Sequence, residues 1–451
     1  MTSTASVAPE GRTQHSGAQD AASKDKALRR AVVASTIGTI IEWFDYALYG
    51  AAAGLIINKL FFPQLSPSAA VLASFATFAV GFVARPLGGI VIAHLGDRFG
   101  RKPALLLTIA MMGISTVAMG MLPTFAQVGL LAPALLVLFR LVQGFGAGAE
   151  YAGAVTLVAE YAPPHRKAYY TAYLQSATVV GILLATLCFL LVSYLPEDVL
   201  LGWAWRVPFL ASALLFLVAL YIRNRLDETP EYVEAMARQS ARRREESVPI
   251  GQLLRNSPRE VLFGFLSVTG HNANAYVLST FSLSYMTNTL HMARTDALTA
   301  VLLATVVGVV STPFFGLLAD RIGHAKVYIG GALFTLVFAF PLFALLDTRS
   351  VVWATLGLSL GYGIGFAGLA SAQGAFLANL FPTRYRFSGI ALSRELSSLV
   401  VAGPTPFIAS ALVAANGGSS SWVAVYVMAC CAVTVWAVLA VRSSSYERGS
   451  A

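Results

Sequence analysis

A series of long apolar runs, separated by short polar or turn-rich breaks, most constrains what this chain can fold into. A helix needs about 20 apolar residues to cross the roughly 30 Å hydrocarbon core of a bilayer. Twelve runs approach or exceed that length, at residues 31–57, 69–94, 104–122, 130–160, 169–194, 204–222, 260–287, 298–318, 327–346, 351–379, 387–413 and 421–441. Charged residues make up only 12% of the chain, against roughly 25% in soluble proteins. The sequence therefore predicts an all-α, multi-pass protein with twelve transmembrane helices in a lipid bilayer.

Most of the 31 Lys and Arg residues fall in breaks that share one side of the membrane when both chain ends lie on that side. Since cytoplasmic loops retain positive charge, this distribution predicts a bacterial inner (plasma) membrane protein with both termini in the cytoplasm. The formal net charge of +9 then reflects topology and anionic lipid headgroups, and we expect no nucleic-acid binding.

The charged segments divide the chain into two expected halves of six helices each. Residues 31–222 form the N-terminal half and residues 260–441 the C-terminal half, joined by a cytoplasmic central loop at 223–259. Residues 1–30 are polar and predict a disordered cytoplasmic N-terminus, and residues 442–451 predict a cytoplasmic tail.

The loop after the second run has a counterpart in the second half. The stretch "AHLGDRFGRKPAL" at 93–105 matches "GLLADRIGHAKVY" at 316–328 when Asp97 is aligned with Asp320. Parallel repeats of six helices, related by an axis along the membrane normal, are a transporter architecture.

This loop motif resembles the signature of the major facilitator superfamily, G-x-L-A/G-D-R-x-G-R-K. The first copy departs from the signature only at Ala93, and the second has His324 and Ala325 in place of Arg-Lys. Other stretches resemble the metabolite:proton symporter branch of that superfamily: "GTIIEWFDYALYG" (38–50), "FAVGFVARPLGG" (78–89), "RLVQGFGAGAEYAGA" (140–154), "WRVPFL" (205–210), "LDETPEY" (226–232) and "FPTRYRFSG" (381–389). The resemblance implies the major facilitator fold and proton-coupled metabolite transport by alternating access.

Glu42 and Asp45 stand near mid-depth of the first run, where a charge costs about 2.5–3.5 kcal/mol. Their i, i+3 spacing puts both carboxylates on one helical face. Either fixed salt bridges hold them, or they line a cavity in which they exchange protons or contact substrate.

Further charged residues at similar depth form a nearly balanced set with these two acids. The set comprises the acids Glu42, Asp45, Glu150 and Glu395 and the bases Arg85, Arg140 and Arg394. One acid is in excess, so a single proton would neutralise the set, and a buried carboxylate can take up a proton whereas arginine keeps its charge. We expect Glu42, Asp45 or Glu150 to carry the coupling proton. The resemblance implies that Arg140 belongs to the same apparatus, with a fixed pair to Glu150 or Glu160 as the alternative.

Arg85 is the candidate anchor for an anionic substrate, because its planar guanidinium suits bidentate binding of a carboxylate. Its alternative role is that of a structural partner of Glu42 or Asp45. The polar stretch "GHNANAYVLSTF" at 270–281 predicts a cavity wall, although a buried histidine such as His271 is more often simply hydrogen-bonded. The expected substrate-binding residues are Arg85, Tyr49, His271, Asn274, Arg394 and Glu395.

The repeated loop motif is expected to act apart from substrate chemistry. By resemblance, Asp97 would pair with basic groups or a helix N-terminus of the opposite half in one conformation and release on switching. Ordinary anchoring of positive charge at the cytoplasmic surface is the alternative. The expected conformational latch comprises Asp97, Arg98, Gly100, Arg101, Lys102, Asp320 and Arg321.

Other function classes fit the sequence less well. The six His and three Cys form no metal-ligand or nucleophile pattern, so we expect no enzyme, no cofactor and no metal. A drug/proton antiporter would carry a Gly- and Pro-rich motif in its fifth span, yet the run at 169–194 has no Pro. We predict a monomeric secondary transporter that takes up a small organic metabolite, above all a carboxylate anion, together with protons. Uptake of a betaine- or proline-type osmolyte is the alternative, because that branch shares the same motifs.

Overall fold

A computed structural model of the chain describes residues 32–33, 36–99, 101–148, 158, 162–226, 250–382 and 385–449. Within these ranges, the side chains of residues 93–94, 96–99, 101–105, 164, 219, 222–226, 250 and 442–449 lie outside the description. The described residues are helical throughout apart from short turns and connections, and they contain no strand.

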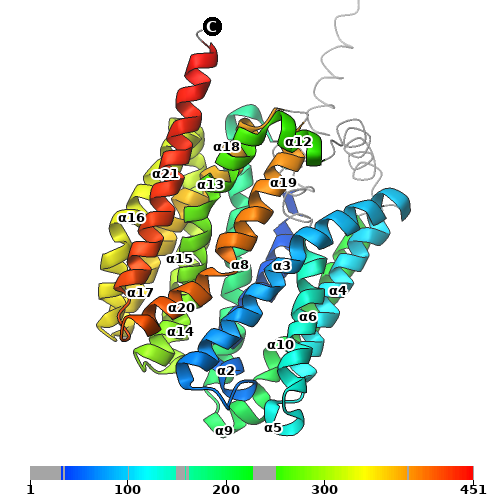
Figure 1. Cartoon of the computed structure of the whole chain (residues 1–451), viewed down its shortest axis with the longest axis vertical. Coiled ribbons are helices and arrows are strands. Elements are labelled where there is room, and N and C mark those ends of the chain that lie inside the picture. The colour runs from blue at the N-terminus through cyan, green and yellow to red at the C-terminus, as the bar shows by residue number, and fades with distance from the viewer. Residues whose placement is uncertain are drawn as a thin grey trace, which may run out of the picture.

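The N-terminal half contributes six long helical segments, which Figure 1 shows in blue to green. They are the helix Thr36–Leu60, α3 (Pro67–Phe99), α4 (Arg101–Met121), α6 (Leu131–Ala147), α8 (Lys167–Ser193) and α10 (Arg206–Leu226). The short helices α5 (Phe125–Val128), α9 (Glu197–Val199) and η3 (Leu200–Ala204) connect them at one end of the bundle, near α2 (Asn58–Leu60). We call this end the lower face, and the opposite end, which carries the C-terminus, the upper face (Figure 1).

The C-terminal half contributes another six helical segments. They are α13 (Pro258–Tyr276) with η4 (Val277–Phe281), α14 (Ser282–Ser284) and η5 (Tyr285–Thr289); α15 (Arg294–Ile322); α16 (His324–Asp347); α17 (Val351–Leu360) with η6 (Gly361–Phe366) and α18 (Ala367–Leu380); α19 (Arg386–Ser397) with η8 (Ser398–Ala402) and α20 (Thr405–Ala415); and α21 (Ser421–Gly449). Each of the twelve expected runs overlaps one of these segments, which confirms the predicted fold class.

Length and composition alone identify fewer spans than the topology contains. Eight helices of the described residues are long and apolar enough to cross a membrane, and the bent pair Glu197–Ala204 and Arg206–Val218 makes a ninth. Helices Leu106–Met121 and Leu131–Ala147 are apolar but shorter. The segment that begins with α13 fails the hydropathy criterion because its middle carries the polar stretch at 270–276.

Two expected segments fall wholly or largely outside the description. Most of the expected central loop, residues 227–249, and the whole expected N-terminal segment 1–30 are not described. The short helix α12 (Ile250–Asn256) lies within the last part of the expected loop. Helix α21 continues through Gly449, so its backbone extends into the expected tail.

Close approach of α3 and α6 explains the glycines in the two motifs that these helices carry. A Cβ on Gly144 would lie 1.8 Å from the carbonyl oxygen of Gly81, and one on Gly148 would lie 2.0 Å from that of Arg85. No side chain fits at such distances, so these positions require glycine while the helices keep this packing. The backbone that carries Arg85 is thereby fixed against α6.

The two halves touch through glycines and small polar side chains. Between the first helix and the segment η4–η5, a Cβ on Gly50 would lie 2.8 Å from Thr280 Oγ1, and Asn288 Nδ2 donates a 2.7 Å hydrogen bond to the carbonyl oxygen of Gly54. On another side of the interface, Ser176 Oγ of α8 donates a 2.8 Å hydrogen bond to Val309 O of α15. Alternating access would have to break these hydrogen bonds and separate these closely packed helices.

Candidate functional site

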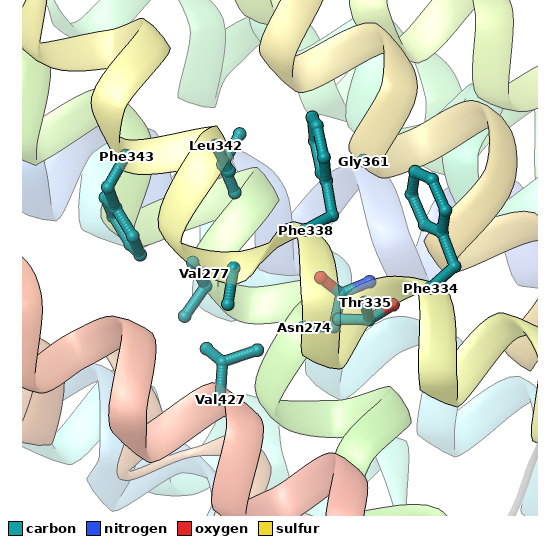
Figure 2. A pocket seen from close by; sticks show the side chains of 10 residues that line it. Asn274, Val277, Phe334, Thr335, Phe338, Leu342, Phe343, Gly361 and Val427 are labelled. Atoms are coloured by element: carbon teal, nitrogen blue, oxygen red, sulfur yellow. The ribbon is translucent and has the colours of Figure 1, made fainter.

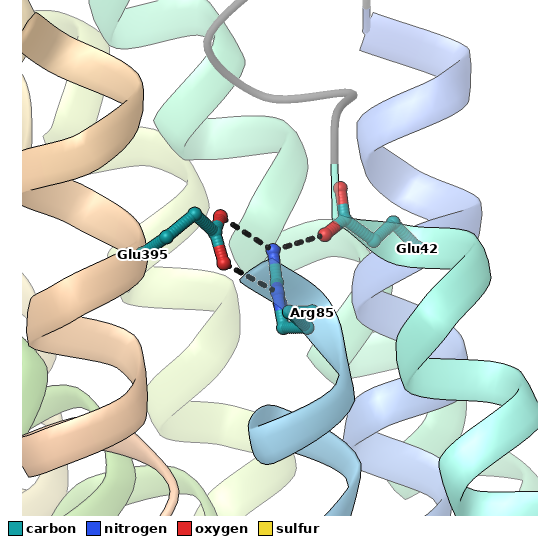
Figure 3. Close-up of polar contacts among 3 residues, drawn as sticks. All are labelled: Glu42, Arg85 and Glu395. Atoms are coloured by element: carbon teal, nitrogen blue, oxygen red, sulfur yellow. Dashed lines mark hydrogen bonds and ion pairs between the residues drawn. The ribbon is translucent and has the colours of Figure 1, made fainter. Parts of the chain in front are cut away.

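An ion cluster joins the two halves inside the bundle. Arg85 of α3 lies between Glu42 of the helix Thr36–Leu60 and Glu395 of α19 (Figure 3). Arg85 Nη2 donates to Glu42 Oε1 at 3.1 Å, and Arg85 Nε donates to Glu395 Oε2 at 3.2 Å. A longer contact of 3.5 Å joins Arg85 Nη2 to Glu395 Oε1. Two carboxylates from opposite halves therefore share one guanidinium.

Burial makes the charges of this cluster costly unless they are paired. The side chains of Arg85 and Glu42 are only 7% and 3% exposed, and that of Glu395 is 17% exposed. Taking a charge out of water costs several kcal/mol unless a partner compensates it. The three described side chains of the cluster are two acids and one base, so these three groups together carry one net negative charge when all are ionised.

Aromatic rings border the cluster on both halves. The guanidinium carbon of Arg85 lies 5.2 Å from the ring centre of Tyr46 and 5.7 Å from that of Phe82, within the range of cation–π attraction. Tyr276 of α13 packs edge-on against Phe82 at 5.7 Å and lies 5.9 Å from Trp43. Rings from the N-terminal half and from Tyr276 thus form a wall beside the ion cluster.

Asp45 belongs to a second, separate network inside the N-terminal half. Thr116 Oγ1 and Gln143 Nε2 donate hydrogen bonds to its two carboxylate oxygens. Arg140 Nη1 donates to Gln143 Oε1, so the Gln143 amide stands between the arginine and the acid. Glu42 and Asp45 share a helical face, as expected from their spacing, yet they serve different partners.

Arg140 is fully buried and held by aromatic and backbone groups. Its Nη2 donates a 2.8 Å hydrogen bond to Phe78 O, and its guanidinium carbon lies 4.1 Å from the ring centre of Tyr49. The Tyr49 hydroxyl lies 2.6 Å from Thr77 Oγ1. A Cβ on Gly81 would lie 2.7 Å from Arg140 Nη2, so this motif glycine makes room for the guanidinium. Tyr49 therefore lies beside Arg140, one of the expected coupling residues.

The expected binding residues of the C-terminal half do not all gather around Arg85. Arg394 Nη1 donates to Gln373 Oε1 at 3.1 Å, inside the C-terminal half. The His271 ring lies 5.2 Å from the Phe366 ring, and in the described structure no hydrogen-bond partner faces its Nδ1. Both side chains are buried.

Asn274 faces a small internal cavity of about 10 Å³ (Figure 2). All of its lining residues come from the C-terminal half, among them Thr335 of α16, Gly361 of η6 and Val427 of α21. That volume suffices for about one water molecule, and no residue of the ion cluster lines it. The cavity therefore cannot hold a metabolite in this conformation.

The second copy of the loop motif makes a contact between halves. Asp320 of α15 accepts 2.9 Å hydrogen bonds from the backbone N–H groups of Ala168 and Tyr169, in the first turn of α8. A carboxylate placed there satisfies donors that the helix itself leaves unpaired and lies at the positive end of the helix dipole.

Several expected site residues lie outside the description. Glu150 and Gly100 are not described, and the same holds for the side chains of Asp97, Arg98, Arg101 and Lys102. Arg321 occupies the last turn of α15 beside Asp320.

Sequence reasoning missed three side chains that organise these networks: Thr116, Gln143 and Gln373. Gln143 could have been found, since it stands three residues after Arg140 and therefore on the same helical face. Thr116 gave no signal, because threonine is common in membrane helices and nothing in its neighbourhood is charged.

The fold and these buried charges define a transporter, and comparison with known proteins identifies its family. The sequence profile of the Major Facilitator Superfamily matches residues 35–393 and 261–449. The chain is 38% identical to the shikimate transporter of Escherichia coli (strain K12) over 417 residues, covering 92% of this chain and 95% of that protein. It is 34% identical to the proline/betaine transporter of Salmonella typhimurium, covering 86% of this chain and 78% of that protein.

This chain belongs to the Major Facilitator Superfamily and is a multi-pass membrane transporter, not an enzyme. A solved crystal structure of a D-xylose-proton symporter has the same fold, with a TM-score of 0.69 over 91% of this chain and 96% of that chain at 21% identity. The resemblance drawn from the loop motif is thereby confirmed.

Proposed function

We propose that this protein takes up a small organic carboxylate together with protons, by alternating access across a bacterial inner membrane. The proposal rests above all on Arg85, which is held between Glu42 and Glu395 from opposite halves. The upper face is the cytoplasmic face in this proposal, and the transporter acts as a monomer. The similarity to a shikimate transporter supports an organic acid as the substrate class.

Proton coupling follows from the two carboxylates that share the Arg85 guanidinium. With both acids ionised, the cluster ties the halves together and carries one net negative charge. A proton on one carboxylate removes both the surplus charge and one of the two ion pairs, since arginine stays charged. When the protonated carboxylate is Glu395, the lost ion pair is the one that joins the halves. The energy of the contact between halves then depends on protonation, which is the requirement for coupling a proton gradient to a conformational change.

The Asp45 network supplies a second place for a proton. In the described structure its carboxylate accepts hydrogen bonds from the neutral groups of Thr116 and Gln143, while Arg140 lies one amide further away. A protonated Asp45 could donate to Gln143 or Thr116 after their groups turn, so either charge state can be accommodated.

Osmolyte uptake is the second candidate, favoured by the aromatic wall and by the similarity to a proline/betaine transporter. Tyr46, Phe82 and Tyr276 surround the cluster, and aromatic faces attract quaternary ammonium groups. A betaine also carries a carboxylate, so Arg85 would serve either substrate. The two candidates differ in whether the substrate needs a positive group.

Uptake by proteoliposomes tests the proposal. The purified chain would be reconstituted and given an inward proton gradient with labelled shikimate, benzoate, succinate, citrate, proline or glycine betaine. We expect accumulation of at least one acid above equilibrium, abolished by an uncoupler. Uptake insensitive to the uncoupler would overturn proton coupling, and uptake restricted to proline or glycine betaine would replace the organic acid by an osmolyte.

Variants at the acids locate the proton. Glu42→Gln, Asp45→Asn and Glu150→Gln are each expected to retain substrate exchange, and loss of uphill accumulation identifies a proton carrier. Full uphill uptake in all three single variants would remove this group of acids from the coupling mechanism.

A further inference from the structure

Glu395 engages Arg85 in the manner of a bound carboxylate ligand. Its two oxygens face the Nε and Nη2 edge of the guanidinium, at 3.2 Å and 3.5 Å (Figure 3). This edge offers two roughly parallel N–H groups, the geometry that arginine uses for bidentate carboxylate binding. Glu42 instead meets Arg85 through Nη2 alone.

We infer that the Glu395 carboxylate occupies the place on Arg85 that the substrate carboxylate takes during transport. The inference deepens the proposed function and rests on it. A proton from water on the open side binds a Glu395 oxygen and neutralises that side chain. The ion pair with Arg85 is then lost, and the substrate carboxylate forms the two hydrogen bonds in its place.

Three features distinguish Glu395 from Glu42 in this role. Glu395 belongs to the opposite half from Arg85, so its departure also releases a contact between halves. Its side chain is 17% exposed whereas that of Glu42 is 3% exposed, so water reaches Glu395 more readily. Once Glu395 is protonated, Glu42 remains as the counter-charge of Arg85 until the substrate arrives.

The charged and titratable groups around Glu395 would allow a substrate carboxylate to replace the Glu395 carboxylate on Arg85. Arg85 on α3 is its ion-pair partner, and that guanidinium is also surrounded by Glu42 and Tyr46 of the first helix and by Tyr276 of α13. Arg394 is its neighbour on α19 and is bonded to Gln373. The described parts of α18 and η8 carry no titratable side chain. Of these groups, Arg85 is the one shown in direct contact with the Glu395 carboxylate.

Ordered binding follows from this replacement. While Glu395 is ionised it excludes a second carboxylate from Arg85, so the proton must bind before the substrate. After the substrate leaves, Glu395 loses its proton and pairs with Arg85 again. One proton therefore accompanies one substrate carboxylate at this position.

Acetate serves as a probe that does not depend on the identity of the substrate. The full-length chain would be purified in detergent, and its Tm measured against rising sodium acetate at constant ionic strength. Acetamide is the uncharged control of the same shape. Glu395→Ala empties the place beside Arg85, and Glu395→Gln mimics the protonated side chain with little change of volume. Glu197→Ala, which removes an exposed acid at the lower face, is the matched control.

At pH 7.5 we expect acetate, but not acetamide, to raise the Tm of Glu395→Ala and Glu395→Gln saturably by about 2–4 °C. The unmodified protein and Glu197→Ala should show this effect only as the pH falls toward 5. Adding Arg85→Gln to Glu395→Ala should abolish it.

Three results would overturn the inference: no saturable acetate effect in either Glu395 variant, an effect that survives loss of Arg85, or an equal effect in the unmodified protein at pH 7.5 and pH 5. The pH comparison needs no variant, so the inference can fail even if both substitutions prevent folding. Failure of proton-driven uptake with acetate binding intact would instead count against the proposed function alone.

Discussion

The carboxylate of Asp320 accepts a 2.9 Å hydrogen bond from the backbone N–H of Ala168, and the two residues belong to opposite halves of the transporter. The contact uses only the carboxylate and the end of α8. It does not use the Arg-Lys pair of the signature, which His324 and Ala325 replace in this copy. The degenerate second copy therefore retains the group that joins the halves.

Asp320→Asn should slow transport while changing the half-saturating substrate concentration little. The amide keeps one acceptor but loses the charge at the helix N-terminus, which costs about 1–2 kcal/mol and shifts the balance of conformations roughly five- to thirtyfold. Initial uptake rates over a range of substrate concentrations measure both quantities. A large loss of affinity with normal turnover would assign Asp320 to substrate binding.

Asp97→Asn is the matched comparison in the first motif copy. The sequence predicts a greater slowing for this variant than for Asp320→Asn, because the first copy retains Arg101 and Lys102. The same uptake-rate measurements show which of the two variants is slower. Equal or smaller slowing at Asp97 would show that the Arg-Lys pair contributes nothing to the latch.

Gly144→Ala should destabilise the protein and impair transport. Its Cβ would lie 1.8 Å from Gly81 O, so α3 and α6 must move apart, and overpacking of this kind costs about 1–3 kcal/mol. The shift also moves the α3 backbone that carries Arg85. Gly330→Ala is the control, since no described atom beyond its own stretch of helix lies within 4 Å of the added Cβ. The Tm of both variants in detergent tests this. Equal values would contradict the close packing of α3 against α6.

Gln143→Leu should harm the protein more than Thr116→Val. The first change removes the amide that bonds both Asp45 and Arg140, so two buried charged groups each lose a partner. This loss should lower the free energy of unfolding by about 3–5 kcal/mol. The second change removes one hydroxyl donor to Asp45, which should lower the free energy of unfolding by about 1–3 kcal/mol. Thermal unfolding of the two variants gives the order. A milder effect at Gln143 would mean that Arg140 and Asp45 pair directly once the amide is gone.

Much of the fold could be predicted from the sequence because the membrane imposes it. Every backbone group in the hydrocarbon core must be bonded internally, so long apolar runs have to be helices. The segment around His271 and Asn274 is polar, yet the run at 260–287 that contains it is long enough to be predicted as a helix too. The π-helical turns such as η4 and η6 were not predictable, since they depend on how the helices pack.

The candidate site was predictable in its charges but not in its pairings. The cost of burial singled out Glu42, Asp45 and Arg85 from the sequence. Which acid meets which base depends on the rotation of each helix and on the contact between halves, so the sequence left Glu42 and Asp45 as equal partners for Arg85. The structure pairs Arg85 with Glu42 and with Glu395, from a helix roughly three hundred residues away.

Arg85→Lys keeps the charge of the cluster but loses the planar edge that Glu395 occupies. An ammonium cannot offer two parallel N–H groups to a carboxylate, so the half-saturating concentration of a transported acid should rise about ten- to a hundredfold, the value of one charge-assisted hydrogen bond. Concentration-dependent uptake in proteoliposomes measures this.

If Arg85 only neutralises the acids, lysine will be tolerated. In that case Arg85→Gln combined with Glu42→Gln or Glu395→Gln will restore uptake, because each pair preserves the net charge of the cluster. Rescue by either double variant would exclude Arg85 as the anchor of the substrate carboxylate.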